Sequence, residues 1–162
     1  MCIRDSFRFS GVRKSAVFDR ERATTWDMVD FESNDITHWQ KGDVRRRVPM
    51  GPQLRNLLWE WKHIQAPREN DNRIFPFSSA TEDRALALMK EVASELGGAL
   101  RDMTFFHNLK HYFKTQHQLQ RTPNEISDFL TLNAPPRWRA SGDTYRHGNY
   151  ELARKCVERV QL

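Results

Sequence analysis

Residues 26–50 read WDMVDFESNDITHWQKGDVRRRVPM, and in this stretch apolar runs alternate with turn sequences. The residues at 33–35 and 41–43 are rich in Asn, Asp and Gly, which tolerate the backbone conformations of tight turns. Pro49 ends the last run, because proline has no amide hydrogen to donate to a sheet. We expect three strands, at 26–31, 36–40 and 44–48. The stretch therefore predicts a small antiparallel sheet with an arginine-rich last strand.

The remainder of the chain is predicted to be helical, because apolar residues recur there at intervals of three and four. We expect helices at 13–19, 52–65, 81–96, 104–119, 123–129 and 149–160. Thr122 and Glu125 have the spacing of a capping box at the start of the fifth helix. The segment 133–143 contains Pro135-Pro136 and is expected to be a loop. The predicted fold class is α+β and mainly helical, with the three-stranded sheet at one edge.

The length and composition of the chain limit the class of protein to which it can belong. The chain has 162 residues, which fits one domain with a real core. Its mean hydropathy is −0.78 and charged residues make up 29%, which favours a soluble protein. No apolar run approaches the roughly 18–20 residues that cross a bilayer. Cys2 and Cys156 are far apart, so neither a disulfide framework nor a CxxC metal site is indicated. A reduced, intracellular setting is expected.

The charge is positive and unevenly distributed. The formal net charge is +5 and the isoelectric point is about 9.5, which is compatible with a polyanionic partner. Basic residues cluster at Lys41 with Arg45–Arg47, at Lys110 with His111 and Lys114, and at Arg137, Arg139 and Arg146. Acidic residues gather elsewhere, at 69–71, 82–83 and 91–95. This segregation favours nucleic acid over mere solubility as the explanation of the charge.

Two short runs suggest chemistry on a phosphate. In HNLKH at 107–111, His107, Lys110 and His111 are spaced to share one cationic helix face. In TYRH at 144–147, Tyr145 lies beside an arginine and a histidine. Nearby positive charge favours the phenolate form of a tyrosine. The combination predicts a tyrosine nucleophile that attacks a phosphate group.

Five motifs follow one another along the chain: SGVRKS at 10–15, WDMVD at 26–30, QKGDVRRRVPM at 40–50, RIFP at 73–76 and HNLKH at 107–111. In that order they resemble the segments T-G-L-R-x-S-E, W-x-D-I-D, G-K-G-x-x-x-R-x-V-P-L, (I/L)-F-P and H-x-L-R-H of tyrosine recombinases, also called phage integrases. The resemblance covers the chain from about Phe9 to its end. It implies the fold of that family's catalytic domain.

The resemblance also implies catalytic roles. Arg13 corresponds to the first catalytic arginine, and Lys41 to the hairpin lysine that protonates the leaving 5′ oxygen. Tyr145 corresponds to the nucleophile, shortly before the last helix, which would form a 3′-phosphotyrosine. The implied catalytic set is Arg13, Lys41, His107, Lys110, Asn133 and Tyr145. Because fixed cations would stabilise the transition state, no metal or other cofactor is implied.

Three positions depart from the family's pattern. Lys110 replaces the second arginine, which keeps the charge but loses the planar fork. Asn133 takes the place of a histidine, which keeps N–H donors but loses proton transfer. Ala16 stands where an acidic residue is common. These changes favour an alternative, a catalytically impaired relic that still binds DNA. A further alternative is a basic protein-interaction or RNA-binding module.

The resemblance implies double-stranded DNA as the partner and no membrane. The expected DNA contacts are Arg45, Arg46, Arg47, His111, Arg137 and Arg139. The full-length protein is expected to be a homo-oligomer, a tetramer on DNA, encoded by a bacterium or phage and located in the cytoplasm at the nucleoid. Residues 1–6, MCIRDS, resemble a translated sequencing adapter. Residues 7–162 would be the catalytic domain without the N-terminal DNA-binding domain.

Other roles for these residues stay open. Tyr145 could be a packing tyrosine, and Tyr150, at the start of the last expected helix, is a rival nucleophile. Tyr112 is a weaker rival, because its place in the helix at 104–119 is expected to face the core. His107 and His111 have the spacing of two zinc ligands, but the HExxH glutamate and a third ligand are missing. A zinc site is therefore disfavoured.

Overall fold

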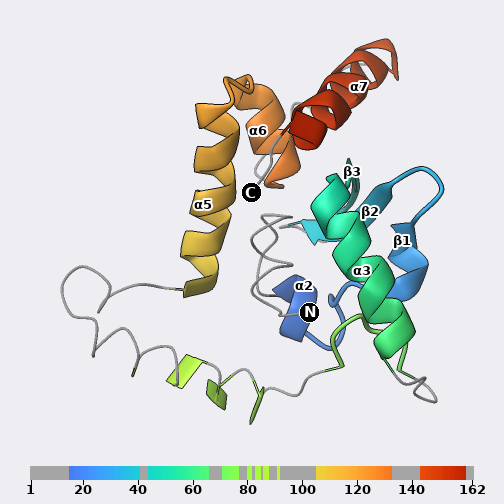
Figure 1. Cartoon of the computed structure of the whole chain (residues 1–162), viewed down its shortest axis with the longest axis vertical. Coiled ribbons are helices and arrows are strands. Elements are labelled where there is room, and N and C mark those ends of the chain that lie inside the picture. The colour runs from blue at the N-terminus through green and yellow to red at the C-terminus, as the bar shows by residue number, and fades with distance from the viewer. Residues whose placement is uncertain are drawn as a thin grey trace.

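The computed structural model describes residues 15–40, 44–65, 71–76, 80–81, 83–84, 86–87, 91, 105–132 and 143–159. Their order is α2 (Ser15–Phe18), the 3-10 helix η1 (Trp26–Met28), β1 (Val29–Asp30), β2 (Asp35–Gln40), β3 (Val44–Pro49), α3 (Pro52–Ile64), α5 (Phe105–Leu119), α6 (Asn124–Leu130) and α7 (Asp143–Arg159). The fold is α+β and mainly helical, with a three-stranded antiparallel sheet (Figure 1). The predicted fold class is confirmed.

The sheet has the order β1-β2-β3, and both strand pairs are antiparallel. Its first strand is shorter than the predicted 26–31, because residues 26–28 form the 3-10 turn η1. Asp30 ends the strand by accepting hydrogen bonds from the backbone N–H groups of Glu32 and Ser33. The long β2–β3 hairpin matches the prediction within one residue at each end.

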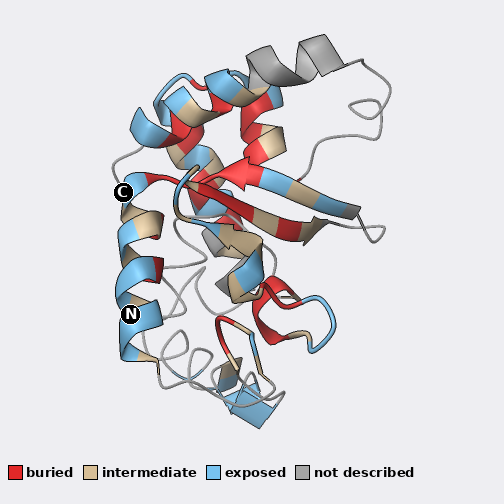
Figure 2. Cartoon of the chain, turned by 90° about the vertical axis from the view of Figure 1, so that its right-hand side faces the viewer, coloured by how far each residue is buried: buried red, intermediate tan, exposed pale blue. Residues whose placement is uncertain are grey.

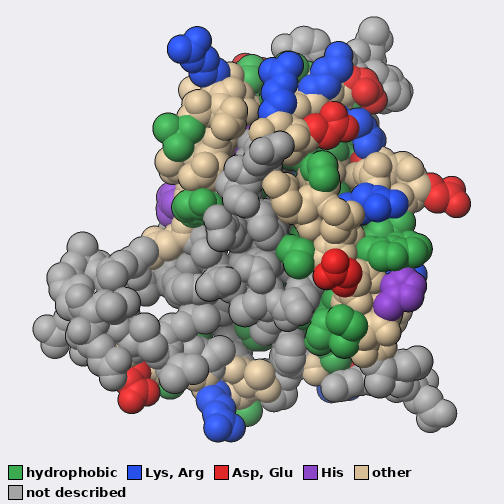
Figure 3. Space-filling model, in the orientation of Figure 1, with side chains coloured by type: hydrophobic (Ala, Val, Ile, Leu, Met, Phe, Trp, Pro, Cys, Tyr) green, Lys and Arg blue, Asp and Glu red, His purple; other side chains and the backbone are tan. Residues whose placement is uncertain are grey.

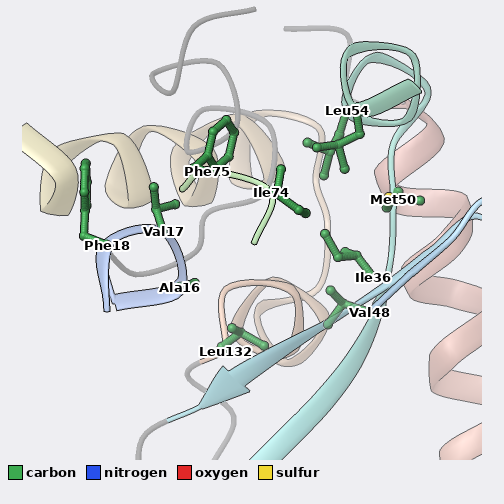
Figure 4. Close-up of a cluster of buried hydrophobic side chains, with 11 residues drawn as sticks. Ala16, Val17, Phe18, Ile36, Val48, Met50, Leu54, Ile74, Phe75 and Leu132 are labelled. Carbon is green, nitrogen blue, oxygen red and sulfur yellow. The ribbon is translucent and has the colours of Figure 1, made fainter. Parts of the chain in front are cut away.

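One hydrophobic cluster lies between the sheet, α2 and α3 (Figure 4). Pro52 begins α3, where its missing N–H costs no hydrogen bond. Leu54 and Leu58 follow at a spacing of four and are almost fully buried. The cluster consists of Ala16, Val17, Phe18, Ile36, Val48, Met50, Leu54, Leu58, Ile74, Phe75 and Leu132. Ile64, in the last turn of α3, lies outside the cluster and is 69% exposed.

A second cluster lies among α5, α6 and α7, whose buried sides face one another (Figure 2). It contains Phe113, Ile126, Leu130, Ala153, Cys156 and Val157. Phe129 of α6 packs against both clusters and so joins the helices to the sheet. Both α6 and α7 contact β3, the strand at the edge of the sheet.

Two helix starts differ from the sequence prediction. The N-cap of α6 is Pro123, without a side-chain cap, so the capping box at Thr122 and Glu125 is wrong. The hydroxyl oxygen of Thr122 lies 3.2 Å from Nδ1 of the buried His117 instead. The last helix begins at Asp143 rather than at 149. Tyr145 therefore lies inside the first turn of α7 and not before the helix.

Several predicted segments fall partly on residues that are not described. The expected helix at 81–96 is helical at 80–81, 83–84, 86–87 and 91. The expected helix at 13–19 is helical at 15–18. Most of the expected loop at 133–143 and the whole hairpin turn at 41–43 lie outside the described residues.

Two histidines are buried inside the fold. Nδ1 of His38 in β2 lies 2.8 Å from the Thr24 hydroxyl oxygen, and the edge of the His117 ring packs against Phe113. Burial lowers the pKa of His38 from 6.5 to about 3. Burial also lowers the pKa of His117 from 6.5 to about 4. Both rings are therefore neutral in the folded protein near neutral pH.

Acid should destabilise the fold through these two histidines. Their folded pKa values lie below the unfolded value, so the unfolded chain binds more protons once the pH falls below about 6.5. Going from about pH 7 to about pH 5 should lower the free energy of unfolding by about 2 kcal/mol for each histidine. Urea denaturation at a series of pH values measures this loss.

The variant His117→Gln provides the control, because it removes one ionisable ring and keeps a polar side chain. The variant can already be less stable than the parent near neutral pH. Its further loss of unfolding free energy between about pH 7 and about pH 5 should be about 2 kcal/mol smaller than that of the parent. Identical acid losses in the parent and the variant would contradict the assignment.

Candidate functional site

The residues predicted from the sequence fall into three groups. Five lie outside the described residues: Arg13, Lys41, Asn133, Arg137 and Arg139. His107 and Tyr145 are placed by their helix backbones, on α5 and in the first turn of α7. The side chains of Arg45, Arg46, Arg47, Lys110 and His111 are described in full.

The described basic residues of α5 do not share one face. The side chain of Lys110 is buried, with 7% of its surface exposed, whereas His111 is exposed. Phe113, three residues after Lys110, is buried on the same side of the helix. Tyr112 is 37% exposed, so the expectation that it faces the core is wrong. The predicted common cationic face of Lys110 and His111 is therefore divided between the interior and the surface.

Lys114 of the same basic cluster has an internal partner. Its ammonium nitrogen lies 2.7 Å from Oδ1 of Asp128, and both side chains are about one-third exposed. This ion pair joins α5 to α6. Partly exposed pairs of this kind contribute little stability.

The strand register separates the three arginines of β3. Arg45 pairs with Trp39, Arg46 with His38, and Arg47 with Thr37. Because successive residues of a strand point to opposite faces, Arg45 and Arg47 share one face and Arg46 lies on the other. The exposed guanidinium of Arg45 stacks 4.6 Å from the centre of the Trp39 ring. That of Arg46 lies 5.5 Å from the centre of the Phe129 ring in α6.

Arg47 forms ion pairs and hydrogen bonds within the sheet. Its Nε donates to Oδ2 of Asp35 at 2.8 Å, and its Nη2 donates to the Ser33 hydroxyl oxygen at 2.7 Å. Nη2 also lies 3.5 Å from Oδ2 of Asp30. The side chain is 55% exposed, but its guanidinium forms ion pairs and hydrogen bonds with neighbouring acidic and polar groups.

The carboxylate of Asp35 is the centre of this network, since only 2% of its side chain is exposed. Its Oδ1 accepts hydrogen bonds from the Tyr150 hydroxyl at 2.5 Å and from Nη2 of Arg154 at 3.0 Å. Nη1 of Arg154 donates to the backbone oxygen of Ser33 at 2.6 Å. We call Asp35, Arg47, Tyr150 and Arg154 the Asp35 hub. The hub ties α7 to both long strands.

The hub disfavours Tyr150 as a nucleophile. Burial raises the pKa of the Tyr150 phenol well above its ordinary value, and the hydrogen bond to Asp35 raises the pKa further. The phenol therefore stays protonated and donates its proton to a carboxylate. A nucleophile needs the opposite arrangement, an adjacent base or cations that lower its pKa.

The hub was not predicted from the sequence, in which three of its four members suggested other roles. Asp35 was predicted to lie in a turn, Arg47 to contact DNA, and Tyr150 to be a rival nucleophile. One signal was present: Tyr150 and Arg154 are four residues apart and share a helix face. The strand register supplies the other half, since Asp35 and Arg47 are diagonal neighbours on one face of the hairpin.

Figure 3 shows how the charges are distributed on one face of the molecule. Lys and Arg side chains gather at the end formed by α6, α7 and the turn between α5 and α6, with acidic side chains among them. Among the side chains that are described, no three His, Cys, Asp or Glu residues lie together as a metal site would require. Within the same part of the chain, no helix is long and apolar enough to span a bilayer.

Comparison with known proteins finds a match in structure. The integrase from mycobacterium phage Brujita superposes with a TM-score of 0.62 and 14% sequence identity, over 98% of this chain and 51% of that chain. The likeness shows the fold, and this chain spans about half the length of that integrase. No protein-family model matches the chain. No curated protein sequence matches it either.

The hub predicts that substitutions of two arginines on the same face of β3 lower the free energy of unfolding by different amounts. Arg47→Ala should lower the free energy of unfolding by about 1–3 kcal/mol, because the buried Asp35 loses its charged hydrogen-bond donor from β3. Arg45→Ala, two residues earlier, removes only an exposed stacking contact and should cost less than about 1 kcal/mol. Urea denaturation of both variants measures the contrast. Equal losses would show that the hub does not stabilise the fold.

Proposed function

We propose that this chain is the catalytic part of a site-specific DNA recombinase or integrase, which cuts and rejoins DNA strands through Tyr145. The observation that carries the proposal is the phage-integrase fold, in which the helix that bears Tyr145 packs on the hairpin strand β3. The order of motifs along the chain supports the same conclusion, as does the net charge of +5.

The proposed reaction is a phosphoryl transfer without metal. The Tyr145 oxygen attacks the phosphorus of a DNA phosphodiester while its phenolic proton passes to a base, for which His107 is the candidate, and the bond from phosphorus to the 5′ oxygen breaks. Lys41 gives its proton to that leaving oxygen as general acid. Reversal of the two steps reseals a strand, because the 3′-phosphotyrosine retains an activated phosphoester.

The other residues of the proposed site stabilise charge. The phosphorus centre carries extra negative charge in the transition state, and fixed cationic donors are most effective there. Arg13 supplies a bidentate fork, and Lys110 supplies a single ammonium. His107 donates a hydrogen bond or moves a proton. Asn133 donates through its amide.

The described cations suggest which of them bind the DNA backbone. Arg45 is exposed, with its guanidinium over the Trp39 ring, and we expect its N–H groups to bind phosphate oxygens. His111 is exposed on α5. Arg46 and Arg47 contact Phe129 and Asp35, so we assign them to support of the hairpin. Arg137 and Arg139 would add phosphate contacts, and the full-length protein would assemble as a tetramer on double-stranded DNA.

A covalent protein–DNA adduct tests the nucleophile directly. The probe is a pool of nicked duplexes with randomised sequence, in which the cleaved fragment diffuses away and traps the adduct. The parent chain should form an adduct that survives denaturing electrophoresis. Tyr145→Phe should abolish it, because the attacking oxygen is gone.

The matched control is Tyr112→Phe, since Tyr112 also offers a partly exposed phenol. This variant should form the adduct at the parental rate. An adduct that persists in Tyr145→Phe, or a parent chain that forms none, would contradict Tyr145 as the nucleophile of an active recombinase.

A second candidate function is a DNA-binding relic without strand cleavage. It is favoured by Lys110, whose buried side chain offers one ammonium where the family has a planar fork. A relic would still bind DNA with an affinity that falls steeply as salt rises, because phosphate contacts release counterions. A salt-insensitive partner would instead favour the protein-interaction alternative.

The double variant Lys110→Arg, Asn133→His tests the relic. Each restored donor should raise the rate of adduct formation by about 10²–10³, the usual effect of one transition-state donor. Lys114→Arg is the control on the same helix, and its rate should not change, because Lys114 is paired with Asp128. A folded double variant without any gain would count against the relic.

A further inference from the structure

We propose that the Asp35 hub is a positioning device for the reaction, which fixes the helix of Tyr145 against the hairpin of Lys41. The proposal rests on the proposed function of the same site. The four hub residues act through Tyr145 and Lys41, so they are positioning residues rather than catalytic ones.

The hairpin half of the device is built into β2 and β3. Asp35 is the first residue of β2, and Arg47 lies diagonally across from it in β3. Their side chains are joined by the Nε hydrogen bond of 2.8 Å. Lys41 follows β2 directly in the sequence. The two strands that carry the hub are therefore the two strands that hold the turn of Lys41.

The helix contributes Tyr150 and Arg154 to the hub, and Tyr150 lies about one and a half turns after the proposed nucleophile. Tyr150 and Arg154 are four residues apart on α7, and both donate to Oδ1 of Asp35. Tyr145 lies five residues before Tyr150, about 7.5 Å along the helix axis. Because α7 is continuous from Asp143 to Arg159, a shift of the helix at Tyr150 moves the backbone of Tyr145 with it.

The hydrogen bonds of the hub are more directional than the apolar packing of α7. Among the side chains of α7 that are described, at 150–159, the buried apolar ones are Ala153, Cys156 and Val157. Burial of apolar surface is non-directional and tolerates small shifts. The hub adds directional hydrogen bonds of 2.5–3.0 Å from α7 to Asp35 of β2 and to the backbone oxygen of Ser33, just before that strand.

The hub is better explained as a means of positioning α7 than as a source of net stability. Burying a carboxylate with its cations often contributes little net stability, because the desolvation cost offsets the attraction. The register of an element is the best-attested role of such a buried polar group. Here the carboxylate is satisfied only when β2, β3 and α7 are all in place.

Tyr150→Phe tests the proposal, because it removes one hydrogen bond and keeps the ring, whose centre lies 6.1 Å from that of Phe129. Hydrogen exchange of the amides at 143–149 should become faster, while that of α3 stays unchanged. With the nicked DNA pool at saturation, the rate of adduct formation should fall about 10- to 100-fold, as small misplacements of a reacting group do. The DNA affinity should stay within about twofold.

Glu151→Gln is the matched control, an exposed neighbour on the same helix. It should match the parent in exchange, rate and affinity. All rates are measured at a temperature at which each variant is fully folded, so that a purely structural role of Tyr150 leaves the rate unchanged. If Tyr150→Phe does not fold, Arg154→Lys takes its place. It keeps the charge but cannot bind Asp35 and the Ser33 oxygen together.

The outcomes separate this proposal from the proposed function. If the parent forms the adduct and the hub variant forms it at the parental rate, the positioning role is overturned and the recombinase stands. If the parent forms no adduct, the proposed function fails and the positioning role fails with it. If exchange at 143–149 is unchanged in the hub variant, the hub does not fix that part of α7 and the proposal is overturned on physical grounds alone.

Discussion

The arrangement of the sheet and the last helix depends on one buried carboxylate. Asp35 is withdrawn from water and accepts hydrogen bonds from Arg47, Tyr150 and Arg154. A carboxylate in such a place is tolerated only when its donors are present, since an uncompensated buried charge is strongly destabilising. Arg47 comes from the hairpin, and Tyr150 and Arg154 from a helix more than a hundred residues further along the chain. The local register of the hairpin and the docking of α7 therefore satisfy the same requirement.

Apolar contacts supply the rest of the attachment. Phe129 of α6 packs against both hydrophobic clusters, and its ring also meets Arg46 and Tyr150. Gly51, just before α3, approaches α7 so closely that a Cβ there would lie 3.2 Å from Cγ1 of Val157 and 3.3 Å from its backbone oxygen. The beginning of α3 and the end of α7 thus meet closely, and a Cβ at Gly51 would require Val157 to move by a few tenths of an ångström. These contacts bring α7 to the sheet, and the directional bonds of the hub set where along the sheet it lies.

Local features explain what could be predicted from the sequence. The β2–β3 hairpin was predicted within a residue, because its turn residues, its strand pattern and Pro49 all act over short distances. Tertiary contacts decided the remainder. Thr122 has the spacing of a helix cap, but its hydroxyl lies beside the buried His117, which needs a polar partner more than the helix end does. The start of α7 at Asp143 precedes the predicted start by two turns, in a polar stretch where no apolar periodicity marks a helix. The candidate catalytic set stays a prediction as a whole, because Arg13, Lys41 and Asn133 lie outside the described residues and His107 and Tyr145 are placed only by their backbones.

The basic clusters show why the number of basic residues in a sequence overstates the number of cations that are available to bind a ligand. The arginines of β3 look equivalent in the sequence, yet Arg47 neutralises Asp35, Arg46 lies over Phe129, and Arg45 is exposed on Trp39. Lys114 and Arg154 are likewise bound to Asp128 and Asp35. Pairing leaves the net charge of +5 unchanged, so the long-range attraction of a polyanion persists. What pairing removes is the freedom of each cation to reorient toward a phosphate. For a protein that acts on DNA, the paired cations would then fix the shape of the hairpin and helix, and the exposed ones would make the contacts.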